Sequence, residues 1–361
     1  MKIMQVIPAF GTGGGEIMCE TLTTKLTELG HEVMAVSLYK EETAITERLQ
    51  KKGIKVLFVG KKPGFDLSCI LELRKIIRSF KPDIIHTHLY ALKYAVFAKL
   101  FFKTKEVHTI HNIAEKEAST TDQKLNRLFY RLKLAIPVSL SQEIQKTVVA
   151  LYRISPQNCP VVLNGIDLSK CLPKVDYGLH SPIKIIHVGR FSEQKNHVYI
   201  IEALKQLPRN TFCLDFWGDG ELLGSIKNLA KQYRLEGEIN FNGTTDNILK
   251  ELANADIFIL PSKWEGVPMS IIEAMGTGLP IVASAVGGIP DMLINEESAL
   301  LLNAVGDPSE LANALFRLSI SKELREKLGT QAHTDAELFS SDSMARRYVN
   351  IYQGNWRSNQ S

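Results

Sequence analysis

The chain has 361 residues, of which 45% are hydrophobic and 23% are charged, and this composition supports about two folded domains with substantial cores. No apolar run reaches the roughly twenty residues of a membrane-spanning helix. The first residues, M-K-I-M-Q-V-I-P, favour a buried strand over a secretory signal. The five cysteines are scattered and form no C-x-x-C pair, which favours reduced thiols in the cytoplasm and argues against a structural zinc site.

The net charge of +4 is unevenly distributed along the chain. Residues 1–170 contain 25 Lys and Arg against 16 Asp and Glu, a net charge of +9, whereas residues 171–361 contain 18 against 23, a net charge of −5. The difference predicts separate partners for the two halves. An anionic membrane surface or a lipid-phosphate acceptor suits the basic half. Nucleic acid is not expected as a partner, because the sequence contains no motif that would recognise it.

The first half alternates between predicted strands and helices, which is typical of a parallel sheet with helices on both faces. A glycine-rich loop at 11–16 follows the first strand and would let backbone N–H groups approach a phosphate. It is neither a dinucleotide fingerprint, because Glu16 replaces the third glycine, nor a Walker loop. Strands are predicted at 2–10, 32–39, 55–59, 83–88, 105–112, 135–140 and 160–163, and helices from the glycine loop to about 29, at 43–52 and at 68–80.

Two histidines, His88 and His111, lie at the ends of predicted strands. Sheets of this kind bind ligands at the carboxyl ends of their strands, so both side chains could reach a ligand there. Each also has a structural interpretation. His88 could be a hydrogen-bonded residue at a strand end, and His111 could form a capping turn with Asn112.

Two stretches, 89–105 and 124–134, combine an apolar helical face with basic residues. Such a helix can lie on an anionic membrane surface, or its apolar face can pack on the sheet while the lysines remain solvated. The basic residues are Lys93, Lys99, Lys103 and Lys105 in the first stretch and Lys124, Arg127, Arg131 and Lys133 in the second.

The second half repeats the alternation after an irregular linker at 168–181. The loop that follows its first strand contains Arg190 and Lys195. Two fixed cations are what a diphosphate leaving group requires. Strands are predicted at 183–188, 211–217, 239–242, 256–262, 281–284 and 298–303, and helices at 248–253, from about 268, at 308–318 and at 341–352.

The stretch 265–274, E-G-V-P-M-S-I-I-E-A, lies between two buried predicted strands. Pro268 favours the first turn of a helix, which also contains Ser270. The free N–H groups of that turn, together with the helix dipole, predict an anion site. Glu265 precedes the helix and Glu273 lies about one turn inside it, so the two carboxylates could accept hydrogen bonds from sugar hydroxyls on either side of a phosphate.

The run E-G-V-P-M-S-I-I-E resembles the E-x7-E signature of retaining glycosyltransferases of family 4, which have the two-domain GT-B architecture. Further matches extend the resemblance over nearly the whole chain. They are the G-G-x-E entry at 13–16, the N-G-I-D turn at 164–167, the G-R-F-x-x-x-K-N run at 189–196, the G-D-G turn at 218–220 and a G-G-x-P-E-like turn at 287–291 that has Asp291 in place of Glu.

The resemblance implies an α/β fold with two Rossmann-like parallel-sheet domains facing a central cleft. Residues 1–170 would form the acceptor domain, joined by a C-terminal crossover helix within 341–361, and residues 171–340 the nucleotide-sugar donor domain. The implied catalytic residues are His111, Arg190, Lys195 and Glu265. The implied donor-binding residues are Gly14, Gly243, Val267, Pro268, Met269, Ser270 and Glu273.

The implied reaction moves a hexose or N-acetylhexosamine from a nucleotide diphosphate sugar, with a UDP-sugar favoured, to a hydroxyl of a lipid-linked glycan. Family members do this with retention of configuration, in polysaccharide or glycoconjugate biosynthesis. No metal or other cofactor is expected, because the sequence has no Asp-x-Asp pair after a strand and no cluster with metal-ligand spacing. The enzyme is expected in the cytoplasm, including the inner face of the membrane. A GT-B nucleotide-sugar epimerase and a noncatalytic sugar-nucleotide-binding subunit are the alternatives.

Overall fold

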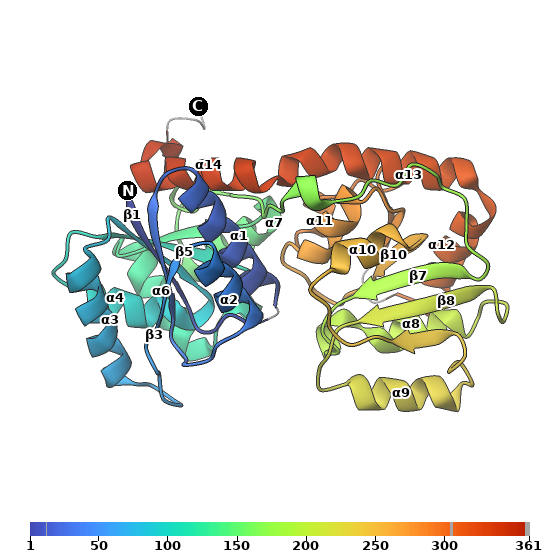
Figure 1. Cartoon of the computed structure of the whole chain (residues 1–361), viewed down its shortest axis with the longest axis horizontal. Coiled ribbons are helices and arrows are strands. Elements are labelled where there is room, and N and C mark those ends of the chain that lie inside the picture. Colours follow the sequence, from blue (N-terminus) through green and yellow to red (C-terminus); the bar gives the residue numbers. More distant parts are fainter. Residues whose placement is uncertain (12, 304–305, 358–361) are drawn as a thin grey trace. The chain divides into compact units, whose positions relative to one another are not determined.

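The structure is a computed structural model that describes residues 1–11, 13–303 and 306–357. Thr12 of the glycine loop and residues 358–361 of the predicted C-terminal segment lie outside the described residues. The chain divides into two compact units (Figure 1). Unit 1 comprises Met1–Ile166 and the chain from Ser340 onward, and unit 2 comprises Asp167–Phe339. The sequence predicts these divisions after residues 170 and 340.

Unit 1 is built on a six-stranded parallel sheet with the strand order β3-β2-β1-β4-β5-β6. Its strands are almost continuously buried, as expected for a parallel sheet that is covered on both faces. The strands are β1 (Lys2–Ile7), β2 (Glu32–Ser37), β3 (Lys55–Phe58), β4 (Ile84–His88), β5 (Lys105–Ile110) and β6 (Ile136–Ser139).

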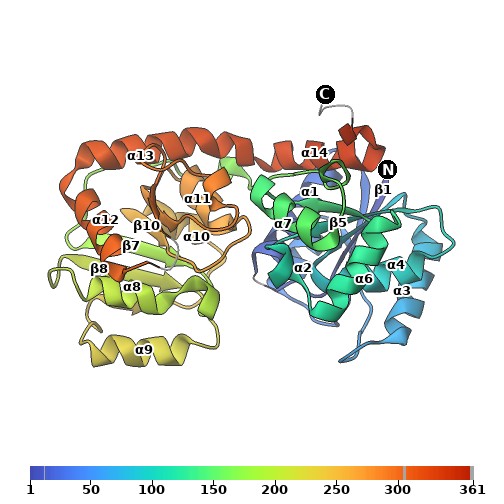
Figure 2. The same cartoon turned by 180° about the vertical axis from the view of Figure 1, so that it is seen from behind.

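Two hydrophobic clusters cover the two faces of this sheet. Alternate strand residues such as Met4 and Val6 pack against α3 and α4, whereas Ile7 and Ala35 pack against α1 and α2. The α1 and α2 side faces the viewer in Figure 1, and the α6 and α7 side in Figure 2. The helices are α1 (Gly14–Glu28), α2 (Ala44–Lys51), α3 (Leu67–Phe80), α4 (Leu92–Lys99), α5 (Ala114–Glu117), α6 (Thr120–Arg131), α7 (Gln142–Tyr152) and α14 (Ser341–Gln353).

The C-terminal helix α14 belongs to unit 1, although the chain reaches it from unit 2. The Ser340 side chain accepts a hydrogen bond from the Ser343 N–H and so caps the helix. Lys25 of α1 forms an ion pair with Asp342 at 3.3 Å. Tyr348 and Tyr352 are buried and bond to Thr109 and His86 of the sheet, each at 2.7 Å. The terminal helix is therefore fixed to this sheet by packing and by polar contacts.

Unit 2 has a second six-stranded parallel sheet, with the order β12-β11-β10-β7-β8-β9. Numbered from its own first strand, this is the same order as in unit 1, so the chain uses one topology twice. The strands are β7 (Ile183–Val188), β8 (Phe212–Trp217), β9 (Ile239–Phe241), β10 (Ile257–Leu260), β11 (Ile281–Ser284) and β12 (Leu300–Leu302).

One face of the second sheet packs against α8, α9 and α12 through a single large hydrophobic cluster. On α11, Ile271, Ile272 and Met275 are fully buried, and this helix lies against α10, α13 and β11. The helices are α8 (His197–Leu204), α9 (Leu223–Gln232), α10 (Ile248–Ala253), α11 (Met269–Gly276), α12 (Pro308–Ile320) and α13 (Lys322–Asp335). Short 3-10 turns occur at Leu89–Ala91, Pro156–Asn158, Leu168–Lys170, Glu193–Lys195, Ile289–Asp291, Ala336–Phe339 and Asn355–Arg357.

The predicted strand at 160–163 is wrong. Two hydrogen bonds join this segment to Ser139 at the end of β6, one from Ser139 N–H to the Pro160 carbonyl and one from Val162 N–H to the Ser139 carbonyl. Only Val161 forms an isolated bridge with that strand. Pro160 has no N–H to donate, which limits the pairing. None of the helices that the structure describes is both long and apolar enough to cross a bilayer.

Candidate functional site

The predicted site residues lie at equivalent places in the two sheets. In each sheet the strand order reverses between the first and fourth strands, β1 and β4 in unit 1 and β7 and β10 in unit 2. Ligands of open α/β sheets bind beyond the carboxyl ends of the strands at such a reversal. His88 ends β4, whereas Lys195 follows β7 and Glu265 follows β10.

In unit 2, two residues with separately predicted roles form one ion pair. Lys195 Nζ lies 2.6 Å from Glu265 Oε1. The Lys195 side chain is 14% exposed and that of Glu265 is 5% exposed, so water screens the pair only weakly. Lys195 and Glu265 therefore contact each other directly in a largely buried setting.

Two further side chains hold Glu265, and the sequence pattern does not single them out. The Ser262 hydroxyl donates to Glu265 Oε1 at 2.6 Å, and Gln194 Nε2 donates to Oε2 at 3.2 Å. Gln194 also bonds the Trp264 carbonyl at 3.0 Å. Gln194 occupies a variable position of the run that carries Lys195, so only its place next to that lysine could have suggested a role.

Glycine at position 287 allows a close approach of backbone to the Glu265 loop. A Cβ atom there would lie 1.8 Å from the Glu265 carbonyl oxygen, and the residue has a left-handed φ of +55°. The neighbouring Gly288 N–H bonds the Gly266 carbonyl at 3.0 Å. The glycine pair at 287–288 therefore positions Glu265 through its main chain.

The loop that carries Arg190 rests on the G-D-G turn. A Cβ atom at Gly218 would lie 2.0 Å from the Gly189 carbonyl oxygen, so only glycine permits this contact. The Phe191 N–H bonds the Asp219 carbonyl at 3.0 Å. The Arg190 side chain is exposed and makes no hydrogen bond or ion pair with the residues that the structure describes. The loop thus holds a cation that is available to an anion.

The residues around the start of α11 are mostly buried. Pro268 is the N-cap in extended conformation (φ −70°, ψ 124°), one residue before the helix rather than inside its first turn as predicted. Val267 and Met269 are both 4% exposed, and Ser270 is buried. These residues can therefore contact a ligand mainly through backbone groups at the helix start. Gly243, after β9, has a φ of +71°, and its carbonyl accepts from the Gly218 N–H at 2.7 Å.

Glu273 is half-buried on α11 and has no side-chain hydrogen bond or ion pair with the described residues. Burial raises the pKa of its carboxyl group from 4.5 to about 7. A carboxyl group kept from water without a protein partner destabilises the fold. Raised pKa values of this kind cluster at functional sites, so Glu273 is a candidate to bind a ligand.

In unit 1, the predicted residues surround the start of α1. Gly14 is its first residue, and Gly13 is the N-cap. His111 follows β5, and its Nε2 lies 3.0 Å from His88 Nδ1. Burial lowers the pKa of His111 to about 4, so the ring is neutral at pH 7. His88 is buried and hydrogen-bonded, in keeping with its structural interpretation, and Asn112 Oδ1 accepts from the Ile113 N–H at 2.8 Å in a local turn.

Within residues 1–11, 13–303 and 306–357, no group of three or more His, Cys, Asp or Glu side chains is arranged to hold a metal ion.

Two family models match consecutive parts of the chain. Residues 12–170 match glycosyltransferase family 4, and residues 176–335 match glycosyl transferases group 1. Together they span most of both units.

Curated relatives match much of the chain at modest identity. The UDP-Gal:alpha-D-GlcNAc-diphosphoundecaprenol alpha-1,3-galactosyltransferase of Escherichia coli is 29% identical over 282 residues, 72% of each chain. The N-acetyl-alpha-D-glucosaminyl L-malate synthase of Bacillus anthracis is 26% identical over 369 residues, 94% of this chain and 93% of that one. Among solved structures, Anabaena HepE in complex with UDP-glucose superposes with a TM-score of 0.88 at 19% identity, over 98% of this chain and all of that chain.

Proposed function

Because the chain belongs to the group 1 glycosyltransferases and has their GT-B fold, we propose that it is a retaining hexosyltransferase. It moves a hexose or N-acetylhexosamine from a nucleotide diphosphate sugar to a sugar hydroxyl of a lipid-linked glycan. The products are a lengthened glycan and a nucleoside diphosphate, in a pathway of glycan or polysaccharide biosynthesis.

The ion pair of Lys195 and Glu265 carries this proposal. A sugar nucleotide presents a diphosphate next to a neutral, hydroxyl-rich ring, and the pair offers a cation for the first and a carboxylate for the second. Arg190 supplies a further cation from the same loop as Lys195. Preorganised charges of this kind stabilise negative charge that develops on a leaving group.

Glu273 completes the donor site in this proposal by accepting hydrogen bonds from the ribose hydroxyls. The backbone N–H groups at the start of α11 add partial positive charge toward the phosphates. We assign to His111, neutral at pH 7, a hydrogen bond with a sugar hydroxyl. In this proposal Gly14, the first residue of α1, approaches the phosphate or acceptor side, and Gly243 lies in the turn that seats the base.

The chemistry requires no protein nucleophile. The bond between the anomeric carbon and the diphosphate oxygen breaks, and the acceptor oxygen bonds to that carbon on the same face. The acceptor proton passes to the departing phosphate oxygen. Arg190, Lys195 and the helix start serve the diphosphate in place of a divalent ion, so we expect EDTA to leave the rate unchanged.

A UDP-sugar is the preferred donor in this proposal. The name of the Escherichia coli relative specifies UDP-Gal and a diphosphoundecaprenol acceptor, and Anabaena HepE has been solved in complex with UDP, with UDP and glucose, and with UDP-glucose. These names support a UDP-sugar donor and a lipid-linked acceptor for this chain. The choice of base is tested by thermal shift against UDP-, GDP- and ADP-sugars, with the free sugars as controls.

The reaction itself is tested with purified protein, a sugar nucleotide and a lipid-linked glycan acceptor, with NMR of the anomeric proton in the product. Retention predicts the same anomeric configuration in donor and product, and inversion would contradict the proposed mechanism. Incubation without acceptor separates the rivals, because an epimerase changes the sugar of the donor. A noncatalytic subunit binds the donor and leaves it intact with or without acceptor.

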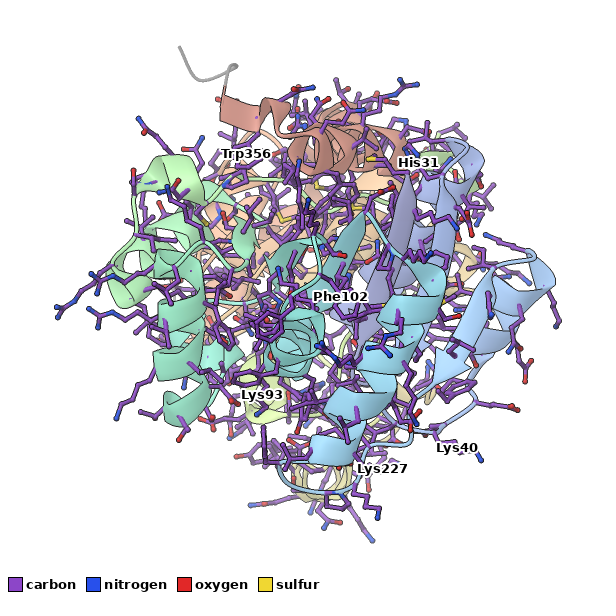
Figure 3. All side chains as sticks on the ribbon, turned by 90° about the vertical axis from the view of Figure 1, so that its left-hand side faces the viewer. His31, Lys40, Lys93, Phe102, Lys227 and Trp356 are labelled. Atoms are coloured by element: carbon purple, nitrogen blue, oxygen red, sulfur yellow. The ribbon has the colours of Figure 1, made fainter. Side chains whose placement is uncertain are left out.

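A membrane-bound acceptor also suits an exposed surface of unit 1, the Phe101 surface, formed by Leu100, Phe101, Lys103, Leu132 and Lys133. Phe101 is 96% exposed in a left-handed conformation (φ +75°), and Leu132 is 59% exposed. Lys99 Nζ bonds the Leu134 carbonyl at 2.6 Å, so the end of α4 lies against the end of α6. Figure 3 faces this side of unit 1, with Lys93 and Phe102 labelled.

Arg74 of α3 holds the turn at 98–102 in place, and the Phe101 side chain in this turn is exposed to solvent. Arg74 donates to the carbonyls of Ala98 and Leu100 at 3.1 and 2.9 Å, and its guanidinium lies 4.9 Å from the centre of the Phe102 ring. An exposed aromatic residue between lysines suits the interface of an anionic bilayer. These features support our proposal that the enzyme acts at the cytoplasmic face of the membrane.

Flotation with vesicles tests this part of the proposal. Binding to phosphatidylglycerol-containing vesicles should weaken with salt and should fall several-fold in Phe101→Ser. Val175→Ser is the matched control, because Val175 is 95% exposed but lies in unit 2. Equal binding by both variants, or no binding at low salt, would remove the membrane from the proposal.

A further inference from the structure

Three neighbouring strands of unit 1 contribute side chains to one hydrogen-bonded chain that ends at His111. His88 Nε2 lies 2.9 Å from Gln5 Oε1, and His88 Nδ1 lies 3.0 Å from His111 Nε2. Gln5 comes from β1, His88 ends β4, and His111 follows β5. Gln5 and His88 are fully buried, whereas His111 is half-buried. This series of hydrogen bonds therefore leads from the core of unit 1 to the carboxyl ends of the strands.

The proton positions follow from Gln5. In this orientation of the amide, which leaves Gln5 Nε2 buried without a hydrogen-bond partner among the described residues, Oε1 faces His88 and can only accept a hydrogen bond, so His88 Nε2 carries the proton. Burial lowers the pKa of His88 well below its ordinary value, so the ring is neutral and has a single N–H. His88 Nδ1 is then an acceptor, and the N–H that it faces belongs to His111 Nε2.

His111 Nδ1 is left with its lone pair. This atom has no hydrogen-bond partner among the described residues and is not among their buried, unpaired side-chain atoms. A Cβ atom at Gly15 would lie 3.3 Å from it, a contact tighter than most, so glycine leaves space beside the ring. His111 Nδ1 is thus the ring nitrogen that remains for a ligand.

We propose that His88 and Gln5 are positioning residues that hold His111 in its Nε2–H tautomer, so that Nδ1 accepts a hydrogen bond from a hydroxyl group of a bound sugar. The identity of the ligand rests on the proposed function. The tautomer does not, because it is a property of the protein without substrate. Two buried groups thereby decide which atom of His111 meets the substrate, although neither touches it.

Long-range proton–nitrogen NMR of protein labelled with 15N in histidine measures the tautomer directly. At pH 7 the signals of His111, assigned by their loss in His111→Asn, should show the proton on Nε2 and a lone pair on Nδ1. A proton on Nδ1 in the wild-type protein overturns the proposal without any variant.

Two substitutions of His88 distinguish a role in positioning His111 from a role in packing the core. In His88→Gln the amide oxygen can still accept from His111 Nε2, so the tautomer and most of kcat should survive. In His88→Phe the acceptor is gone, the tautomer should become mixed, and kcat should fall about 10- to 100-fold while the donor KM changes about twofold or less. His86→Gln is the control, because His86 is also buried on β4 but bonds Thr109 and Tyr352 instead of His111.

The outcomes distinguish this inference from the proposed function. If no sugar nucleotide is turned over by the wild-type protein, the proposed function fails while the NMR measurement still decides the tautomer. If transfer occurs but His88→Phe keeps the Nε2–H tautomer, or loses no more activity than His88→Gln, the positioning role is wrong. Should His88→Phe not fold, Gln5→Leu tests the same chain, since it removes the acceptor of the His88 N–H and should mix the His111 tautomer.

Discussion

At the carboxyl ends of its central strands, unit 2 brings charged groups together, whereas unit 1 brings neutral ones together at the corresponding strands. Lys195 and Glu265 form an ion pair at 2.6 Å after β7 and β10. In unit 1, Gln5 within β1, His88 at the end of β4 and His111 after β5 supply an amide and two imidazoles, and burial keeps both rings uncharged. Two sheets with one strand order therefore support opposite chemistry.

In the proposed function, the charged groups of unit 2 serve a diphosphate and the neutral groups of unit 1 serve sugar hydroxyls. A diphosphate needs fixed positive charge, whereas the hydroxyls of a sugar are recognised by neutral acceptors and by carboxylates. The scaffold fixes where the loops lie, and the residues at the strand ends fix what they bind. Substitutions can test whether charge matters in unit 2 and hydrogen-bond direction matters in unit 1.

The largest effect is expected from Lys195→Ala. The substitution removes the cation beside Glu265 and leaves its buried side chain with only the hydrogen bonds from Ser262 and Gln194, so kcat should fall about 100- to 1,000-fold. Lys205→Ala is the matched control, because Lys205 is an exposed lysine of the same unit that pairs with Glu202 at 3.9 Å and lies over the Tyr233 ring, with no contact to Glu265. Steady-state assays with saturating donor make the measurement. Near-normal turnover in Lys195→Ala would show that the charge of Lys195 is not needed for transfer, which contradicts the role given to the charged groups of unit 2.

Glu273→Gln should lower activity and raise stability together. The pKa of Glu273 in the folded protein, about 7, lies above the ordinary 4.5, so the folded state binds more protons between these values. The free energy of unfolding of the wild-type protein therefore falls as pH rises from 4.5 to about 7 and stays lower above that. The variant lacks this loss and should be more stable at pH 8 by about 1–3 kcal/mol.

Urea unfolding at pH 5 and pH 8 measures this difference, and the donor KM of the variant should rise because the ribose loses a carboxylate. A variant that is less stable than the wild type at pH 8 would show that the Glu273 carboxylate has a partner in the protein. Glu297→Gln serves as the control for the change of charge, since residue 297 is an exposed glutamate of the same unit.

Gly287→Ala should displace the Glu265 loop. The new Cβ atom would meet the Glu265 carbonyl oxygen at 1.8 Å in a left-handed conformation, a strain of about 1–3 kcal/mol before the clash is counted. Thermal melting should show a lower midpoint, together with weaker donor binding. Gly224→Ala is the control, because a Cβ atom there meets nothing within 4 Å on helix α9. Equal midpoints for the two variants would contradict the positioning role of Gly287.

The smallest effect is expected from Arg190→Ala. Arg190 is exposed, so water screens its charge and kcat should fall only about tenfold. The loss should shrink as salt is added, because screened charges contribute less. A loss as large as that of Lys195→Ala would show that the exposed cation, and not the buried one, is the main diphosphate ligand.

The sequence predicts the fold well because both sheets are built from short strands that are rich in apolar residues and are separated by turn residues. The strand predicted at 183–188 coincides with β7, and the helix predicted at 248–253 coincides with α10. The segment 160–163 is apolar too, but Pro160 limits its pairing to the end of β6. The sequence assigns no helix to 142–152 or 322–335, where Ser141 and Ser321 cap α7 and α13.

The contacts within the site are beyond prediction from the sequence. Lys195 and Glu265 are 70 positions apart, and the two meet only because β7 and β10 are neighbours in the sheet. The bond of His88 to His111 depends in the same way on the pairing of β4 with β5. Residue types predict what each side chain can do, whereas the strand order decides which partner it has.

A crystal structure of the protein soaked with a UDP-hexose would test the central claim most directly. The diphosphate should lie within hydrogen-bonding distance of Lys195 Nζ and beside the start of α11, with Glu265 on the sugar and Glu273 on the ribose. A sugar nucleotide bound at any other place in unit 2, with the ion pair of Lys195 and Glu265 untouched, would contradict it.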